Sequence, residues 1–451
     1  MAGSIESVMG ALYDDLETNV ARVSGRRELI EAVDIVYHSP CAFSFQGRMI
    51  NKGAMELLVI GDTRTGKTST ITEIMNHFRC GDFISGDSVT MAGLLAGVDE
   101  GARGRFVRSG RLPLNHRGLI TIDEANELDP ELVGKMSSVR SSGVLDIVKI
   151  SSVRLNCIVR QIWIANTKGD KTLAQYPYGI EAVMDLIDKP EDVARFDMVI
   201  GYSESDVDRE ALFRPSREWS KLPHRYNSEC CHSIVRWAWS RKVDDIVISD
   251  ETEDAILEVA EALSGEYDPS IPIMIPAESR IKVAKGAVAV AARCYSTDQQ
   301  REKVIVRPEH ATYYGDAFRR IHSVPSIRFD AWTRKEFAGS ADQQENVEKI
   351  IYALGTQGCE ALLAQKYVSA RRLMEIFGNR EHGERAFQLM TLARVIRKSK
   401  RNAYLSSDFV NQVRAEFERG SLGDVPSGHS LMTSDKGNDW LNSRPREEGL
   451  F

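Results

Sequence analysis

The chain lacks the features expected of a membrane-bound or secreted protein. Its 451 residues contain no run of 18 apolar residues and begin with no charged, apolar, small-residue leader, so neither membrane insertion nor secretion is indicated. The seven cysteines form no Cys-x-x-Cys pair, which argues against a disulfide framework. We therefore expect a cytoplasmic protein with no membrane partner.

The chain also lacks an excess of positive charge and a plausible zinc cluster. A formal net charge of −7 excludes a surface that binds nucleic acid everywhere, so any such contact must be local. Cys230-Cys231-His232, with His224 nearby, is the densest group of metal-ligand residues. Adjacent ligands do not easily share one tetrahedral ion, and the segment continues as an amphipathic helix. We predict no metal site there.

What the chain does contain is an apolar strand that runs directly into the pattern Gly-x-x-x-x-Gly-Lys-Thr. The two glycines let backbone N–H groups turn onto phosphates, Lys67 brings a charge to the β and γ oxygens, and Thr68 offers a hydroxyl to Mg²⁺. The sequence therefore predicts a P-loop for ATP and Mg²⁺. Its cofactor-binding residues are Gly61, Asp62, Thr63, Arg64, Thr65, Gly66, Lys67, Thr68 and Ser69.

Two further strands end in polar side chains that hydrolysis requires. Residues 118–124 are an apolar run ending in Asp123 and Glu124, which resembles a Walker B segment. We predict that Asp123 holds Mg²⁺ with Thr68 and that Glu124 polarises water. Residues 160–166 end in Asn166, which looks like a sensor of the γ-phosphate, although alone it could equally be a turn former.

Between these strands, the stretches SGDSVTMAGLLAGV at 85–98 and GRFVRSGRL at 104–112 resemble the AAA+ core of minichromosome maintenance (MCM) replicative helicases. The resemblance implies a hairpin inserted in helix 2, with its tip at 99–103, that projects into the pore of a ring. It also implies a helix and presensor-1 hairpin at 136–156. Arg103 and Lys149 would then contact DNA.

The motif Ala194-Arg195-Phe196-Asp197 resembles the arginine finger of the same family, although Asp192-Val193-Ala194 replaces the two leucines and serine that usually precede it. A finger neutralises charge at the γ-phosphoryl of the neighbouring subunit. The resemblance thus implies that Arg195 is catalytic together with Lys67, Asp123, Glu124 and Asn166. It also implies a head-to-tail homo-oligomer, expected as a hexameric ring.

Downstream, residues 231–242, 249–264 and 276–295 have the apolar spacing of helices, consistent with an AAA+ lid over the nucleotide. Residues 278–293 resemble the family's sensor-2 helix. The best register puts Ile275 where its arginine should be. Arg280 is the nearest replacement as a cofactor-binding residue, and it can also be explained as an ordinary surface arginine.

Residues 322–345 contain Pro325, Gly339 and many polar side chains and are predicted to be a linker. The segment after it can form three helices (346–354, 369–377 and 382–395) and a two-stranded wing (396–405), which resembles a winged helix. Ten Lys or Arg and only three Glu lie between residues 366 and 401. A solvated basic face on a packing domain is the alternative. The predicted phosphate contacts are Arg385, Arg394, Arg397, Lys398 and Arg401.

The predicted fold class is therefore α/β: an AAA+ P-loop ATPase, with a parallel sheet sandwiched by helices, a helical lid and a C-terminal winged helix. The expected divisions are an extension (1–24), the core (25–225), the lid (226–321), the linker (322–345), the winged helix (346–418) and a disordered tail (419–451). About 50 residues precede Leu57, too few for the oligonucleotide-binding domain of the family. A loader or another DNA-binding partner could supply that function.

The sequence favours a ring-shaped, ATP-driven DNA translocase or helicase. One alternative is a protein-remodelling ATPase of the MoxR or magnesium-chelatase type, which shares the helix-2 insert but acts on polypeptide. Another is a DNA-binding scaffold whose assembly is gated by nucleotide. DNA-stimulated ATP hydrolysis with a steep salt dependence is expected of the DNA translocase and not of the protein-remodelling ATPase.

Overall fold

The computed structural model describes residues 4–101, 104–148, 152–169, 171–206 and 225–363, followed by 368–378, 395–398, 403–405 and single positions up to 414. These residues belong to two compact units, Met1–Arg334 and Lys335–Phe451, and each unit is described by itself. Within the described part of the chain, no helix is long and apolar enough to cross a membrane.

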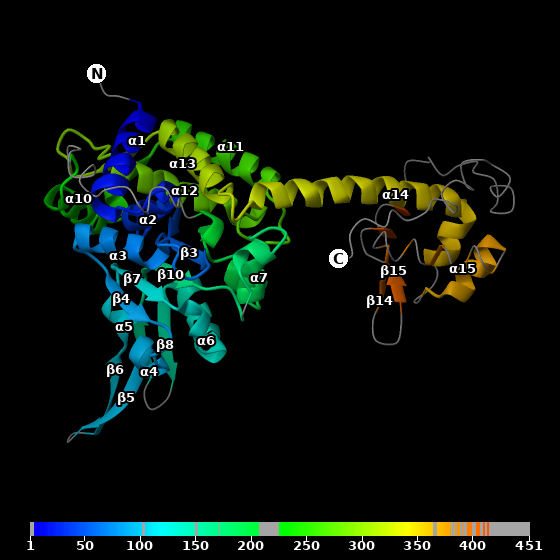
Figure 1. Cartoon of the computed structure of the whole chain (residues 1–451), viewed down its shortest axis with the longest axis horizontal. Coiled ribbons are helices and arrows are strands. Elements are labelled where there is room, and N and C mark those ends of the chain that lie inside the picture. Colours follow the sequence, from blue (N-terminus) through cyan, green and yellow to red (C-terminus); the bar gives the residue numbers. More distant parts are fainter. Residues whose placement is uncertain are drawn as a thin grey trace. The chain divides into compact units, whose positions relative to one another are not determined.

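A five-stranded parallel sheet forms the centre of the first unit (Figure 1). Its order is β11 (Met198–Tyr202), β3 (Glu56–Gly61), β10 (Arg160–Ala165), β7 (Leu119–Asp123) and β4 (Asp82–Ser85). β3, β10 and β11 are buried at every position, which explains their largely apolar, non-alternating sequences. Parallel strands bring their carboxyl ends to one edge of the sheet, so the residues that follow β3, β7 and β10 meet there.

Helices surround this sheet, and α2 packs against both β3 and β10. The predicted α/β P-loop fold is therefore confirmed. The elements before β3 are α1 (Ile5–Asp15), the π-helical η1 (Leu16–Ala21), α2 (Arg27–His38), β1 (Phe43–Phe45) and β2 (Arg48–Ile50). Those among the later strands are α3 (Lys67–Phe78), α6 (Pro130–Ser142), α7 (Glu181–Leu186), α8 (Pro190–Val193) and the short helices η2 (Ala125–Glu127), η3 (Leu173–Gln175) and η4 (Glu204–Asp206).

Two antiparallel hairpins extend from the first unit (Figure 1). β5 (Ala96–Gly101) and β6 (Gly104–Ser109) are flanked by the short helices α4 (Met91–Leu94) and α5 (Arg111–Leu114). β8 (Val144–Val148) and β9 (Ser152–Asn156) follow α6. The predicted contacts Arg103 and Lys149 lie outside the described residues. Of the predicted 99–103 tip, Asp99 already belongs to the paired part of β5, opposite Phe106.

The remainder of the first unit is mainly helical. It contains α10 (Ser228–Ser240), η6 (Val243–Asp245), β12 (Ile246–Ile248), α11 (Asp250–Glu266), α12 (Pro276–Arg293), β13 (Val304–Val306) and α13 (Pro308–His322). α10 begins earlier than expected because the Asn227 side chain accepts a hydrogen bond from Cys230 N at 2.9 Å. α12 packs against α2, α11 and α13, and all of its residues from Lys282 onward are buried.

The second unit has its own small apolar core, formed by residues such as Ile350, Leu354 and Leu373. Its described elements are α14 (Phe329–Leu363), of which the residues up to Arg334 belong to the first unit and which is interrupted at Gly355, α15 (Ala370–Phe377) and the antiparallel pair β14 (Ile396–Lys398) and β15 (Ala403–Leu405). The predicted linker at 322–345 is helical from Phe329 onward. Arg397 and Lys398 belong to β14, whereas Arg385, Arg394, Arg401 and the tail at 419–451 lie outside the described residues.

Candidate nucleotide site

The phosphate loop is a tight turn between β3 and α3. Gly61 has a φ of 149°, and a Cβ there would lie 2.0 Å from the Tyr202 carbonyl oxygen of the adjacent strand. Gly66 has a φ of 82° and is the residue immediately before α3. Both positions therefore require glycine. The loop delivers Lys67 and Thr68 at the first turn of α3, where unpaired backbone N–H groups favour an anion.

The Lys67 side chain folds back over its own loop. Its Nζ donates to the Gly61 carbonyl oxygen at 2.8 Å, to the Asp62 carbonyl oxygen and to Thr65 Oγ1 at 3.3 Å. Burial lowers the pKa of Lys67 to about 8, against the opposing effect of Asp62 and Asp123. The lysine therefore remains charged at neutral pH, with oxygen atoms around its ammonium group.

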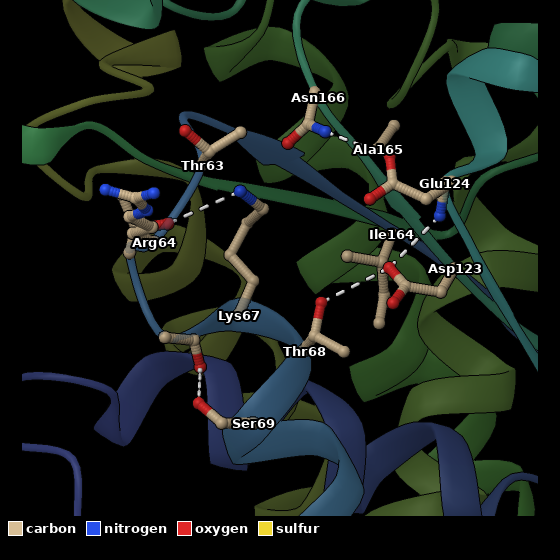
Figure 2. A pocket seen from close by; sticks show the side chains of 12 residues that line it. Thr63, Arg64, Lys67, Thr68, Ser69, Asp123, Glu124, Ile164, Ala165 and Asn166 are labelled. Carbon is tan, nitrogen blue, oxygen red and sulfur yellow. Dashed lines mark hydrogen bonds between the residues drawn. The ribbon is translucent and has the colours of Figure 1, made fainter.

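Thr68 and Asp123 form an oxygen pair at the edge of the sheet. Thr68 Oγ1 donates to Asp123 Oδ1 at 3.2 Å (Figure 2). Asp123 is the last residue of β7, and its carbonyl oxygen accepts from Gly86 N at 2.7 Å, just after β4. A hydroxyl beside a carboxylate is a ligand set that suits Mg²⁺, so these two residues fit that ion.

Glu124 and Asn166 face one another across the same edge. Glu124 has a left-handed backbone, with φ 50° and ψ 43°, and its Oε2 accepts from Asn166 Nδ2 at 3.0 Å (Figure 2). Asn166 N in turn donates to Asn126 Oδ1 at 2.9 Å. Burial, followed by the charge of Asp123, raises the pKa of Glu124. The Asn166 side chain therefore orients a carboxyl group whose basicity is increased.

These side chains line one pocket (Figure 2). Its lining residues are Thr63, Arg64, Thr65, Gly66, Lys67, Thr68, Ser69, Asp123, Glu124, Ile164, Ala165 and Asn166. Asp62, expected to bind the cofactor, points elsewhere: its carboxylate accepts from Leu173 N at 2.7 Å and from Glu204 N at 3.0 Å. It ties the loop to the segments after β10 and β11.

Two predicted arginines are absent from this lining. Arg280 is exposed on α12, and its Nη1 donates to Gln46 Oε1 at 3.4 Å. Arg195 lies in the turn between α8 and β11, where its Nη1 donates to the Glu191 carbonyl oxygen at 2.6 Å and to Asp192 Oδ1 at 2.8 Å. The structure therefore brings neither guanidinium to the pocket of its own chain.

Arg26 supports the phosphate loop and was not predicted. Its buried guanidinium donates to the Thr65 carbonyl oxygen from Nε at 3.0 Å and from Nη2 at 2.7 Å, and it lies 4.2 Å from the centre of the Tyr202 ring. The backbone N of Arg26 donates to Glu17 Oε1 at 2.7 Å. In the sequence it is one of two adjacent arginines, with no local signal that separates it from a surface residue.

Among the residues that the structure describes, no three or more His, Cys, Asp or Glu side chains are grouped so that they could hold a metal ion. His232 Nδ1 lies 2.8 Å from the Phe78 carbonyl oxygen and 3.5 Å from Cys80 Sγ, while Cys231 is buried in the core. His224 is outside the described residues.

Residues 6–205 match the family model described as the MCM P-loop domain. The matched segment includes the sheet, the phosphate loop, Asp123, Glu124, Asn166 and the turn of Arg195. Among curated proteins, no sequence matches the chain significantly.

Proposed function

Because residues 6–205 form a P-loop ATPase domain of the MCM-like AAA+ family, we propose that the protein is a ring-shaped, ATP-driven DNA translocase or helicase. The observation that carries the proposal is the meeting of Thr68, Asp123, Glu124 and Asn166 around the phosphate loop of this domain. These residues provide a metal-binding pair and an oriented base, which ATP hydrolysis requires and phosphate binding alone does not.

In the proposed reaction, Lys67 leaves the carbonyl oxygens of its loop and binds the β and γ oxygens of ATP. The exchange replaces the oxygen partners that the ammonium has in the free protein by the oxygens of ATP. Thr68 and Asp123 would hold Mg²⁺, which supplies positive charge at the phosphates when it is bound. The Ser69 hydroxyl and the backbone N–H groups of the loop complete the phosphate contacts.

Glu124 accepts the proton of the attacking water. Its pKa, raised by burial and by Asp123, makes it a stronger base than an exposed glutamate. Asn166 holds the carboxyl group through Glu124 Oε2, and it reads the γ-phosphate with the rest of its amide. These two residues set the position of the water, which is the main requirement of phosphoryl transfer.

Arg195 acts on the pocket of the next subunit. Arg195 is absent from the lining of its own pocket. An arginine from a neighbouring subunit can neutralise the charge that develops at the γ-phosphoryl. Head-to-tail contacts of this kind close into rings, for which we propose six subunits. Hydrolysis then steps Arg103 and Lys149 along a DNA backbone, while the DNA phosphates are also contacted by Arg385, Arg394, Arg397, Lys398 and Arg401.

The direct test is the ATPase activity of the full chain with and without forked DNA. We expect DNA to stimulate hydrolysis, with most of the stimulation lost between roughly 50 and 200 mM salt because phosphate contacts release counterions. Single-turnover unwinding of the same fork then measures movement. Stimulation by unfolded polypeptide instead of DNA would favour the protein-remodelling alternative.

The shared active site predicts that hydrolysis depends on protein concentration. ATPase activity per subunit should fall on dilution as rings dissociate, while ATP binding persists. Light scattering measured alongside the activity identifies the species present. Monomers that hydrolyse ATP at the undiluted rate would contradict the proposal.

A further inference from the structure

The turn that carries Arg195 is held by a lysine from the lid. Lys282, in α12, donates from Nζ to the Ala194 carbonyl oxygen at 2.6 Å, to the Phe196 carbonyl oxygen at 2.7 Å and to the Ile273 carbonyl oxygen at 2.6 Å. Two of these three acceptors are the residues on either side of Arg195. The backbone of the finger is therefore fixed from a helix 87 positions further along the chain (282 − 195).

The ammonium group of Lys282 is fully used by these contacts. A lysine has three N–H donors, and each has one carbonyl acceptor at hydrogen-bond distance. Lys282 is 3% exposed, and burial lowers its pKa to about 8. Burying the Lys282 ammonium costs free energy of desolvation, which its three carbonyl contacts offset. We infer that the position of these carbonyl groups, and so of the turn around Arg195, matters to the protein.

The two residues after Arg195, Phe196 and Asp197, are also fixed by contacts with their own subunit. The Phe196 ring packs edge-on against Trp163, with centroids 5.5 Å apart, and the Arg140 guanidinium lies 4.4 Å from its centre. Asp197 accepts from Lys285 Nζ at 3.0 Å and from Glu56 N at 2.8 Å. Lys285 belongs to α12 as well, so this lid helix contacts the turn through two lysines, Lys282 and Lys285.

Arg195 itself is less constrained. Its side chain is 22% exposed; Nη1 donates to the Glu191 carbonyl oxygen and to Asp192 Oδ1, and the buried Nε has no hydrogen-bond partner among the residues that the structure describes. Part of the side chain is therefore open to contact from another molecule, on a backbone that its own subunit has fixed. This is the arrangement that a group aimed at another molecule requires.

We propose that Lys282 is a positioning residue for the Arg195 finger, through which the lid of one subunit sets the group that serves the ATP pocket of its neighbour. The inference rests on the proposed function, because it needs the finger to act between subunits. It assigns to α12 a role at the interface that is distinct from covering its own nucleotide.

The test uses mixed rings, and its reference is the pair Lys67→Ala and Arg195→Ala. Lys67→Ala alone has no working ATP pocket, and Arg195→Ala alone has no finger. In an equal mixture, roughly one interface in four joins the intact pocket of one to the intact finger of the other. We expect the mixture to regain roughly a quarter of the wild-type ATPase activity. Failure of this reference pair would overturn the finger between subunits, and with it the proposed function.

Lys282→Met is then mixed with each parent. Alone, it should bind ATP with a Kd within about twofold of wild type and lose roughly 10- to 100-fold in kcat. With Lys67→Ala, which supplies an intact finger, it should regain roughly a quarter of wild-type activity. With Arg195→Ala, which needs the finger of the Lys282→Met subunit, it should regain nothing. Lys303→Met, an exposed lysine beyond α12, is the matched control and should keep wild-type activity.

Two outcomes would overturn the positioning role. Recovery with Arg195→Ala would mean that the finger works without Lys282. Absence of recovery with Lys67→Ala, while the reference pair recovers, would mean that Lys282 serves the fold or its own pocket. If circular dichroism shows that Lys282→Met is unfolded, Lys282→Gln, which keeps two N–H donors, undergoes the same two mixtures and is judged by the same outcomes.

Discussion

Among the individual residues, Lys67 makes nucleotide binding depend on pH. Burial lowers its pKa from 10.5 to about 8 in the free protein, whereas ATP oxygens favour the charged form. Above pH 8, binding must therefore take up a proton, and Kd should rise, approaching tenfold per pH unit. Calorimetric titration of ATP between about pH 7 and 9.5 measures this slope. Lys67→Met should bind weakly without the slope, and a wild-type Kd that stays constant over the range would contradict the assignment.

Glu124→Gln separates binding from hydrolysis. The substitution keeps the shape of the side chain and leaves an oxygen to accept from Asn166 Nδ2, but it removes the base. We expect ATP affinity to change little and kcat to fall roughly 10²- to 10⁴-fold. Glu131→Gln, an exposed residue paired with Lys135 in α6, should leave both unchanged. A normal rate for Glu124→Gln would show that another group takes the proton.

The sequence predicted residues whose roles are encoded locally. The spacing of the P-loop motif already places Lys67 and Thr68 at a helix start, and two apolar runs ending in Asp123 and Asn166 predict one shared edge. Asp62 and Arg26 could not be interpreted in this way. Their partners lie 111 and 39 residues away, and a motif carries no information about contacts over such separations.

Among the secondary-structure elements, the central strands were predictable for a similar reason. β3, β7 and β10 are short, mainly apolar runs, as expected for parallel strands buried on both faces, and a polar residue ends β7 and directly follows β3 and β10. The segment at 322–345 was not, because Pro325 and Gly339 suggested a break in structure. Helix α14 nevertheless begins at Phe329, which is fully buried and packs against Tyr267 with ring centroids 4.8 Å apart.

The connection between α2 and the phosphate loop can be tested at Arg26, which immediately precedes that helix. Arg26→Met keeps much of the buried volume but leaves the Thr65 carbonyl oxygen without its two donors. We expect a loss of about 1–3 kcal/mol in the free energy of unfolding and a roughly tenfold weaker affinity for ATP, because the loop is less well fixed. Urea denaturation and ATP titration measure the two effects.

The matched control is Arg27→Met. Arg27 pairs with Asp14 at the surface, where an ion pair contributes little to stability. Both properties should therefore stay near wild type in this variant. Equal losses in the two variants would show that the contact between Arg26 and Thr65 has no special importance.

At the scale of the whole molecule, chemistry and movement should be separable at Lys149. If Lys149 contacts DNA as proposed, Lys149→Ala removes that contact and leaves the nucleotide pocket unchanged, so basal ATPase should persist while translocation on DNA is lost. Unwinding of a forked duplex measures the movement. Lys303→Ala, an exposed lysine elsewhere, is the control. A Lys149→Ala protein that unwinds the fork at the normal rate would refute the role of this hairpin.

Helix α12 contacts two parts of the chain that the proposed function uses. It packs against α2, which begins directly after Arg26 and so beside the phosphate loop, and it also grips the backbone beside Arg195. Under the proposed function, α12 therefore connects α2, which follows the residue that supports the phosphate loop, to the turn that serves the neighbouring subunit. In the proposed head-to-tail ring, this connection would run from each subunit to only one of its two neighbours, so the coupling between subunits would have a single direction.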